Sequence, residues 1–438
     1  MKYHFVGIKG SGMSALAQII NDLGNEVQGS DITEHLFTQE PLEERGIKLL
    51  PFDANNIIKG MNIIVGNAFN DDHEEVERAK ELGLKIERYF DVLSNLTKRF
   101  KTIAICGCHG KTTTTGLISH VFDKLVGCNY LIGDGTGYAD FRNEYFMLEA
   151  CEYKRTFLHY YPTITIITNI ELDHVDYYKD IDDVILAFQQ FVNQTKDIVF
   201  ACGDNENVHK VTYEKVKFYG FNDDNDIVAK NIELTKDGSN FDVYIDKEFI
   251  GHFDLPLYGK HMVLNALSVI GVSHYIGLDI ELVMNHLKTF KGVKRRFKET
   301  IIDDIITIDD YAHHPTEVRV TIEAARQKYP DKEIVAIFKP NTYTRTRDLA
   351  TDFVKVLDLA DKAYVTDIFC DREQACDYPG ITSDIIISRL RNGEHIGMES
   401  IDKLLRHENA VLVFMSCKNI YALREAYEDK LKEKKGLI

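Results

Sequence analysis

Apolar residues follow two different spacings along this chain, and the two spacings alternate. Nearly continuous apolar runs predict buried strands, whereas apolar residues three and four positions apart predict helices with one buried face. In the first part of the chain, strand-like runs occur at 3–7, 26–31, 48–50 and 62–65, and a helical pattern runs from a glycine-rich turn to Leu23. Alternating strands and helices are typical of an α/β domain with a parallel sheet.

The middle of the chain continues this alternation and then changes. Strands are predicted at 102–106, 145–150, 164–168 and 198–201, and helices at 184–193 and 263–276. Residues 227–253 instead alternate apolar and polar positions, with turn signals at Asp237-Gly238 and Asp246-Lys247. This pattern predicts a small antiparallel appendage.

The last part of the chain returns to alternating strands and helices. Its predicted segments are 305–308, 315–328, 334–338, 347–359, 363–365, 401–406, 411–414 and 421–432. We therefore predict an α/β protein of three domains: a Rossmann-like N-terminal domain at 1–98, a central domain with a mostly parallel sheet at 99–293, and a Rossmann-like C-terminal domain at 294–438.

Composition narrows the possible partners. The 438 residues include 69 Asp and Glu against 52 Lys and Arg, a formal net charge of −17. This balance argues against broad binding to nucleic acid or to anionic membranes. No apolar run is long enough to span a bilayer, and no signal peptide is found, so a cytoplasmic location is expected. None of the eight cysteines forms a C-x-x-C pair, which argues against a zinc site.

One glycine-rich turn carries the strongest chemical signal. The segment Gly107-Cys108-His109-Gly110-Lys111-Thr112-Thr113 follows a predicted strand and leads into a helix. This is the layout of a phosphate-binding P-loop, in which glycines let backbone N–H groups turn toward an anion and the helix N-terminus adds positive charge. Lys111 would reach the terminal phosphates of ATP, and Thr112 would place its hydroxyl on Mg²⁺. The central domain is therefore predicted to be a P-loop ATPase domain.

A second glycine-rich turn, which contains Gly10, Ser11 and Gly12, follows the first predicted strand, and Asp31 ends the second. The pattern has two interpretations. It would hold the pyrophosphate of NAD in a dehydrogenase, or the diphosphate of a UDP-linked substrate in a ligase, because backbone N–H groups bind either diphosphate. The P-loop downstream favours an ATP-driven ligase over a redox enzyme.

Polar residues gather where predicted strands end, which is where open α/β sheets place their sites. Glu152 and His174 follow two strands of the central domain and suit Mg²⁺. Asp310 and His313 follow a strand of the third domain, just before a helix that begins with Pro315.

Two arginines of the last domain are candidates for binding anions. Arg296 stands in a run of three cations at the second domain junction, where an arginine can stabilise charge on a transferring phosphate. Arg345 lies in a donor-rich segment after another strand and is suited to a carboxylate or a phosphate.

Together and in this order, these motifs resemble those of the Mur ligase family. The resemblance covers nearly the whole chain and rests on both glycine turns, Gly29-Ser30-Asp31, Glu149-Ala150-Cys151-Glu152, Thr168-Asn169, Asp173-His174, His261 with Asn265, the segment 292–297, the segment 309–315 and Tyr343-Thr344-Arg345-Thr346. It implies an N-terminal domain for a UDP-sugar, a central ATPase domain and a C-terminal domain for an amino acid. Within the family, the motifs are most similar to those of members that add L-alanine to UDP-N-acetylmuramate in peptidoglycan synthesis.

The resemblance implies a reaction and a role for each matched residue. ATP would phosphorylate the muramoyl carboxylate, and the amine of L-alanine would then form an amide and release ADP and phosphate. The phosphates would be held by Gly107, Gly110, Lys111, Thr112 and Thr113, with Arg296 at the γ-phosphate; one Mg²⁺ would be bound by Thr112 and Glu152, and a second by His174. The adenine would be met by Asn265 and His261, and Asp310 would contact the ribose or take part in domain closure. L-alanine would be placed by His313 and Arg345, and the UDP site would be lined by Gly10, Ser11, Gly12 and Asp31.

The chain departs from the family pattern at three places, of which the first should be mild because the backbone of the loop does the binding. Cys108 replaces a threonine, Asn341 stands where the family has a histidine, and Ser416-Cys417-Lys418-Asn419 replaces a glycine-rich turn with an acid. A related ligase with another amino-acid or peptide acceptor, or a homologue with impaired catalysis, therefore remains as an alternative. Neither nucleic acid nor membrane is an expected partner, and the sequence leaves the oligomeric state open.

Overall fold

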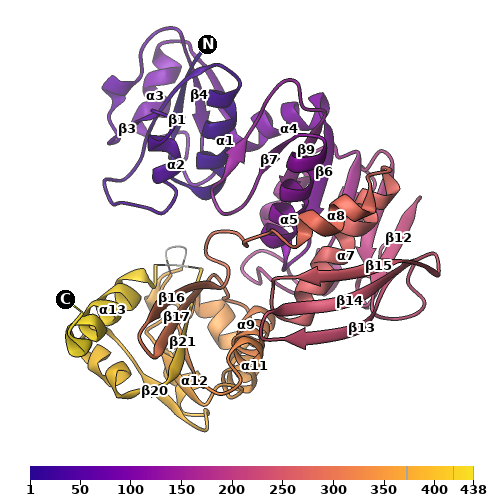
Figure 1. Cartoon of the computed structure of the whole chain (residues 1–438). Coiled ribbons are helices and arrows are strands. Elements are labelled where there is room, and N and C mark those ends of the chain that lie inside the picture. Colours follow the sequence, from indigo (N-terminus) through magenta and orange to yellow (C-terminus); the bar gives the residue numbers. More distant parts are fainter. Residues whose placement is uncertain (371–372, 418, 438) are drawn as a thin grey trace.

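The computed structural model describes residues 1–370, 373–417 and 419–437, which form three α/β units in chain order (Figure 1). Each unit is built on its own sheet, so the predicted fold class is confirmed. The predicted domain boundaries fall near the end of the fourth helix and in the segment before the third sheet, and their exact positions stay predictions. Within the described ranges, no helix combines the length and the apolarity that crossing a bilayer requires.

The N-terminal unit has an entirely parallel five-stranded sheet in the order β3-β2-β1-β4-β5. Its strands are β1 (Lys2–Val6), β2 (Glu26–Ser30), β3 (Lys48–Leu50), β4 (Met61–Val65) and β5 (Lys85–Arg88). Its helices are α1 (Ser11–Asp22), α2 (Glu40–Glu43), η1 (Ala54–Asn56), α3 (Glu74–Glu81) and α4 (Tyr89–Arg99). Because α1 follows β1 after a short turn, the N-terminus of α1 lies at the carboxyl edge of the sheet.

The central unit has a ten-stranded sheet in the order β15-β14-β13-β12-β11-β10-β6-β9-β7-β8. Its strands are β6 (Lys101–Cys106), β7 (Cys128–Leu131), β8 (Gly137–Tyr138), β9 (Tyr145–Glu149), β10 (Ile164–Ile167), β11 (Ile198–Cys202), β12 (Val216–Gly220), β13 (Ile227–Thr235), β14 (Gly238–Ile245) and β15 (Glu248–Leu255). Its helices are α5 (Lys111–Leu125), η2 (Tyr153–His159), α6 (Ile181–Val192), η3 (Val208–Lys210), α7 (Lys260–Tyr275) and α8 (Ile280–Leu287).

The predicted antiparallel hairpins at the end of this unit are present, but they are not a separate appendage. Strand β12 pairs in parallel with the start of β13, at Tyr219 opposite Ile227, so β13 to β15 extend the central sheet. The sequence pattern predicts the strands but not this pairing, because the pairing joins residues on both sides of a loop.

The third unit has a six-stranded sheet in the order β16-β17-β21-β18-β19-β20, with only β16 antiparallel to its neighbour. Its strands are β16 (Lys298–Ile302), β17 (Ile305–Asp310), β18 (Glu333–Phe338), β19 (Lys362–Val365), β20 (Gly393–His395) and β21 (Ala410–Met415). Its helices are α9 (Pro315–Lys328), α10 (Tyr343–Asp348), α11 (Ala350–Leu357), η4 (Ala375–Asp377), α12 (Asp384–Ile387), η5 (Met398–Arg406) and α13 (Tyr421–Lys435). The helix predicted at 347–359 is thus two helices, because the backbone of Leu349 leaves the helical conformation.

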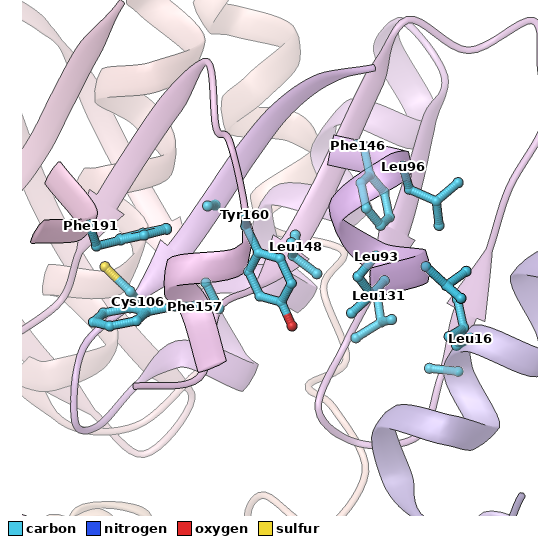
Figure 2. Close-up of a cluster of buried hydrophobic side chains, with 14 of the residues drawn as sticks. Leu16, Leu93, Leu96, Cys106, Leu131, Phe146, Leu148, Phe157, Tyr160 and Phe191 are labelled. Atoms are coloured by element: carbon cyan, nitrogen blue, oxygen red, sulfur yellow. The ribbon is translucent and has the colours of Figure 1, made fainter. Parts of the chain in front are cut away.

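One hydrophobic cluster crosses from the N-terminal unit into the central unit. Leu16 of α1 and Leu96 of α4 belong to the same buried cluster as Leu131, Phe146 and Leu148 of the central sheet (Figure 2). The third unit differs. Among the described residues, its two hydrophobic clusters contain residues from that unit alone.

Candidate active site

The glycine turn between β6 and α5 has the backbone that a phosphate loop needs. Gly107 and Gly110 have φ angles of 136° and 82°, a region that glycine adopts at little cost. A Cβ on Gly107 would also lie 2.0 Å from the hydroxyl of Thr168. Gly110 directly precedes α5, so the N-terminal N–H groups of that helix face the turn.

Two residues at the end of β10 hold this turn from the side. Asn169 Oδ1 accepts hydrogen bonds from the backbone N–H groups of Cys108 and His109, at 3.1 and 3.0 Å. Asn169 Nδ2 and Thr168 Oγ1 donate to the carbonyl of His109, at 3.0 and 2.5 Å. The sequence indicated the Thr168-Asn169 segment, but not that its side chains set the shape of the loop.

Lys111, the first residue of α5, faces a buried carboxylate. Its Nζ is 2.9 Å from Glu152 Oε2 and donates to the carbonyls of Gly107 and Cys108, at 2.5 and 3.1 Å. Burial opposes ionisation of Glu152, but the charges of Lys111 and His174 outweigh it and lower the pKa of that carboxyl. Glu152 is therefore an anion in the centre of the site.

Thr112 and Glu149 complete the set of oxygen atoms beside Lys111. Thr112 Oγ1 donates to Glu149 Oε1 at 3.1 Å, and Gly133 donates its N–H to Glu149 Oε2 at 2.7 Å. Burial raises the pKa of Glu149. A hydroxyl and two carboxylates are the kind of ligands that Mg²⁺ prefers.

His174 lies on the other side of Glu152. Its Nε2 is 3.3 Å from Glu152 Oε1, and its ring is 4.6 Å from that of Tyr153. The buried Nδ1 atom has no hydrogen-bond partner in the part of the chain that the structure describes. The backbone φ of His174, 52°, is unusual for a residue with a side chain. A strained backbone that aims an imidazole at a buried carboxylate is typical of a functional site.

Asp173 and Arg345 join the central and third units. Arg345 Nη2 donates to Asp173 Oδ1 at 2.7 Å, and both side chains are buried. Burial alone would raise the pKa of Asp173, but His174 and Arg345 outweigh it and hold that pKa well below its usual range. The Nε and Nη1 atoms of Arg345 are buried without a hydrogen-bond partner among the described residues. They are available to a carboxylate or a phosphate.

Glu317, in the first turn of α9, gathers the cations of this junction. Its carboxylate lies 3.0 Å from His313 Nδ1, and 3.5 Å from both Arg296 Nη1 and His109 Nδ1. Burial opposes its ionisation, but the histidines outweigh it and hold its pKa well below the usual range. Glu317 and His109 are not among the predicted site residues. One signal was available, since Glu317 stands three residues after the N-cap residue His314, the spacing of a capping box.

Asp310 shapes the backbone that carries Arg296. It accepts hydrogen bonds from the N–H groups of Phe297 and Ala312, at 2.9 and 2.8 Å, and from Thr321 Oγ1 at 3.3 Å. Burial raises its pKa. Asp310 lines a cavity, but a contact with a ribose stays a prediction.

Two neighbouring cavities meet at the P-loop. The first, of about 260 Å³, is lined by residues that include Lys111, Thr112, His174, His313 and Arg345. The second, of about 360 Å³, is lined by residues that include Thr113, His261, Asn265 and Asp310. Gly110 and Arg296 line both.

His261 and Asn265 add uncharged groups to the lining of the second cavity. Burial lowers the pKa of His261 to about 4, so its imidazole is neutral at ordinary pH. The side chain of Asn265 is close to Gly110, where a Cβ would lie 2.9 Å from Asn265 Oδ1. An amide and a neutral imidazole offer hydrogen bonds without charge.

The four predicted residues of the N-terminal unit lie elsewhere. Gly10 is the N-cap of α1, and Asp31 accepts from the N–H groups of Lys9 and Ile32, at 2.7 and 2.8 Å. A Cβ on Gly12 would lie 2.6 Å from the hydroxyl of Tyr89. None of Gly10, Ser11, Gly12 and Asp31 is among the described residues that line the two cavities, although Phe37 of the same unit lines the first.

The departures from the family pattern lie at the same junction. Asn341 is buried and lines the first cavity with Cys417. The Oδ1 atom of Asn341 has no hydrogen-bond partner in the described ranges. Lys418 lies outside the described residues.

Comparison with family models assigns each of the three units to a domain of the Mur ligases. The model of the Mur ligase family catalytic domain matches residues 2–101, that of the Mur ligase middle domain matches 105–273, and that of the Mur ligase glutamate ligase domain matches 295–417. These matches follow one another along the chain and take in both glycine turns.

Solved structures of ligases are similar to most or nearly all of this chain. UDP-N-acetylmuramate–alanine ligase from Thermotoga maritima is 27% identical, with a TM-score of 0.82 over 99% of this chain and 100% of that one. UDP-N-acetylmuramate:L-alanyl-γ-D-glutamyl-meso-diaminopimelate ligase from Neisseria meningitides is also 27% identical, with a TM-score of 0.59 over 67% of this chain and 99% of that one. A murein peptide ligase from Psychrobacter arcticus, at 22% identity and a TM-score of 0.71 over 98% of each chain, shares the fold. The chain belongs to the Mur ligase family of ATP-dependent ligases.

Proposed function

We propose that this chain joins L-alanine to the carboxylate of UDP-N-acetylmuramate, with ATP converted to ADP and phosphate. The observation that carries the proposal is the first cavity, where Lys111, His174 and Arg345 meet from two units. The full-length similarity to the alanine ligase from Thermotoga maritima supports this choice of substrates.

The site residues fit Mg²⁺ and ATP. Thr112, Glu149 and Glu152 supply oxygen ligands, and His174 has a buried ring nitrogen without a hydrogen-bond partner among the described residues. Lys111 would exchange its carbonyl and carboxylate contacts for the phosphates. Bound Mg²⁺–ATP supplies the phosphoryl group that turns a carboxylate, a poor electrophile, into a mixed anhydride.

The other residues act on charge and orientation. Lys111 and Arg296 bring positive charge to the cavity in which phosphoryl transfer and then a tetrahedral anion would develop negative charge. Arg345, held by Asp173, would bind the carboxylate of the amino acid and direct its amine to the anhydride carbon. The amine nitrogen forms the C–N bond, the C–O bond to phosphate breaks as phosphate leaves, and the amine proton passes to solvent. Closure of the third unit over the second would exclude water.

A second candidate is a ligase with a peptide acceptor. It is favoured by two departures from the family pattern that line the first cavity, Asn341 and Cys417, and by the 27% identity to the Neisseria enzyme. A panel decides between the two. We expect ATP-dependent phosphate release that needs both UDP-N-acetylmuramate and L-alanine. Release with a peptide but not with L-alanine would select the second candidate, and no release with any acceptor would contradict both.

Lys111→Ala tests the separation of the two phosphate sites. We expect it to abolish phosphate release and to leave binding of the UDP-sugar nearly unchanged by calorimetry, because Gly10 and Asp31 lie in another unit. A matched loss of UDP-sugar affinity would contradict the two-site assignment. Lys124→Ala, near the exposed end of the same helix, is the control.

A further inference from the structure

The contact between the P-loop and α9 holds side chains that the proposed reaction does not use. His109 of the loop, Glu171 after β10 and His314, the N-cap of α9, each offer one ligand atom, and these atoms lie within 4.8 Å of one another. The rings of His109 and His314 are 4.6 Å apart, and both residues are buried. Two of the three residues belong to the central unit and one to the third.

His109 is the most unusual member of this group. It is only 8% exposed, with Nε2 at 3.5 Å from Glu171 and Nδ1 at 3.5 Å from Glu317. These are ion-pair distances, and neither ring nitrogen makes a hydrogen bond within the described ranges. A buried imidazole between two carboxylates that do not quite reach it marks a place where positive charge is favoured.

The chemistry of the group suits a transition metal. Two imidazoles and one carboxylate, with a position left for water, are a common ligand set for Zn²⁺. The second nitrogen of His109 faces Glu317, as in carboxylate–histidine–zinc arrangements. Burial opposes protonation of His109, but Glu171 and Glu317 outweigh it and raise its pKa to about 10.

Two existing contacts must change when an ion binds. His314 Nδ1 accepts from the N–H of Thr316 at 3.3 Å, and Glu171 Oε2 accepts from the hydroxyl of Thr316 at 2.9 Å. The first is a long hydrogen bond. If Nδ1 takes the ring proton instead, Nε2 becomes free to bind a metal. The second engages Glu171 Oε2, the same oxygen that lies 3.5 Å from His109 Nε2, so an ion would displace the hydroxyl of Thr316.

We propose that His109, Glu171 and His314 bind one divalent transition-metal ion of the Zn²⁺ class, which joins the P-loop to α9. The site is separate from the predicted Mg²⁺ ligands Thr112, Glu152 and His174. The proposal does not depend on the substrates proposed above, because the ion binds without nucleotide or turnover.

Titration with Co²⁺ tests the site, since Co²⁺ bound by nitrogen and oxygen absorbs visible light. The full chain is titrated with saturating Mg²⁺ and no nucleotide. We expect one equivalent of Co²⁺ to bind and Zn²⁺ to displace it. His314→Asn removes the imidazole but keeps a side chain that caps helices well, and we expect its affinity to fall by about tenfold or more. Glu317→Gln, which removes the carboxylate that faces His109 Nδ1, should weaken binding by about tenfold or more.

Matched variants separate this site from others. His252→Asn removes an exposed histidine that lies 2.7 Å from Asp242, and His174→Ala removes a predicted Mg²⁺ ligand. Both should keep the Co²⁺ signal. Absence of saturable binding would overturn the proposal. So would loss of binding in His174→Ala with full binding in His314→Asn. If His314→Asn melts early, Glu171→Gln gives the same test without touching the helix cap.

Discussion

A single side-chain amide, that of Asn169, accepts hydrogen bonds from two consecutive N–H groups of the P-loop. Asn169→Asp keeps the shape and the two hydrogen bonds that Oδ1 accepts, but it loses the one that Nδ2 donates to the carbonyl of His109 and adds negative charge beside the place predicted for phosphates. Like charges this close repel by a few kcal/mol at an effective dielectric of about 20. We expect ADP affinity, measured by calorimetry, to fall by about tenfold to a hundredfold.

The control for this change is Asn55→Asp, an exposed residue of the N-terminal unit. It adds the same charge to the chain and should leave ADP affinity unchanged. Equal affinities of wild type and Asn169→Asp would show that phosphates do not bind at this turn.

Asp309 gives a prediction about pH. It is a buried carboxyl at the end of β17, and burial raises its pKa to about 6. The folded chain thus holds this proton more tightly than the unfolded chain. Its contribution to stability is complete below about pH 4 and is lost as the pH rises through 6.

Asp309→Asn imitates the protonated form and should therefore stabilise the protein at high pH. We expect the free energy of unfolding of the third unit, measured in urea, to increase by roughly 1–2 kcal/mol at about pH 8 and to change very little at about pH 4. This gain in stability is smaller than the pKa shift alone would give, because the variant also loses the ion pair of Asp309 with Arg424, at 3.6 Å. A shift that is the same at both pH values would contradict the assignment.

At the scale of elements, Gly137 of β8 lets the N-terminal and central units approach closely. A Cβ there would lie 2.0 Å from the carbonyl oxygen of Ala15 in α1, a backbone atom that has no other rotamer to adopt. The side-chain amide of Gln18 in α1 also donates a hydrogen bond to the carbonyl of Gly135, just before β8, and accepts one from the N–H of Gly137.

We therefore expect Gly137→Ala to push α1 away and to lower the melting temperature by several degrees, an effect of about 2–3 kcal/mol. Gly46→Ala is the matched control. Nothing lies within 4 Å of its Cβ, so it bears only the cost of a positive φ, about 1 kcal/mol. Equal losses in the two variants would show that this contact carries no close packing.

The elements divide by how local their signals are. Strands β6 and β10 were predicted because both of their faces are covered, which makes their sequences largely apolar. The edge strands β5 and β20 were not, because Lys85–Arg88 and Gly393–His395 are short and largely polar.

The site divides in the same way. Lys111, Glu152 and His174 could be predicted because each follows a strand and sits beside a motif. The role of Glu317 depends on which residues of the central unit face α9, which no local pattern contains. For the same reason the sequence predicted Arg345 as a ligand of the substrate but not its ion pair with Asp173.

At the scale of the whole molecule, polar contacts hold the third unit against the central one. One of them involves Glu317, whose carboxylate lies 3.5 Å from His109 of the P-loop. Glu317→Gln removes the negative charge of this carboxylate, so His109 and Arg296 lose it as an ion-pair partner. We expect the third unit to swing outward and the radius of gyration, measured by small-angle X-ray scattering, to increase.

Glu323→Gln is the control on the same helix, because Glu323 forms an exposed pair with Arg319 at 3.1 Å. Exposed pairs of this kind contribute little, so the radius of gyration should not change. An unchanged radius in Glu317→Gln as well would mean that other contacts, such as Arg345 with Asp173, suffice to hold the unit.

The hydrophobic cluster that joins the first two units bears on how the chain is made. Leu16 and Leu96 leave the ribosome before Leu131, Phe146 and Leu148, the residues that cover them. The first sheet is complete by Arg88, yet one apolar face of α1 and α4 stays in water until the central sheet begins to form. During that interval the nascent chain offers a chaperone a defined apolar surface, and the interval ends when β9 emerges.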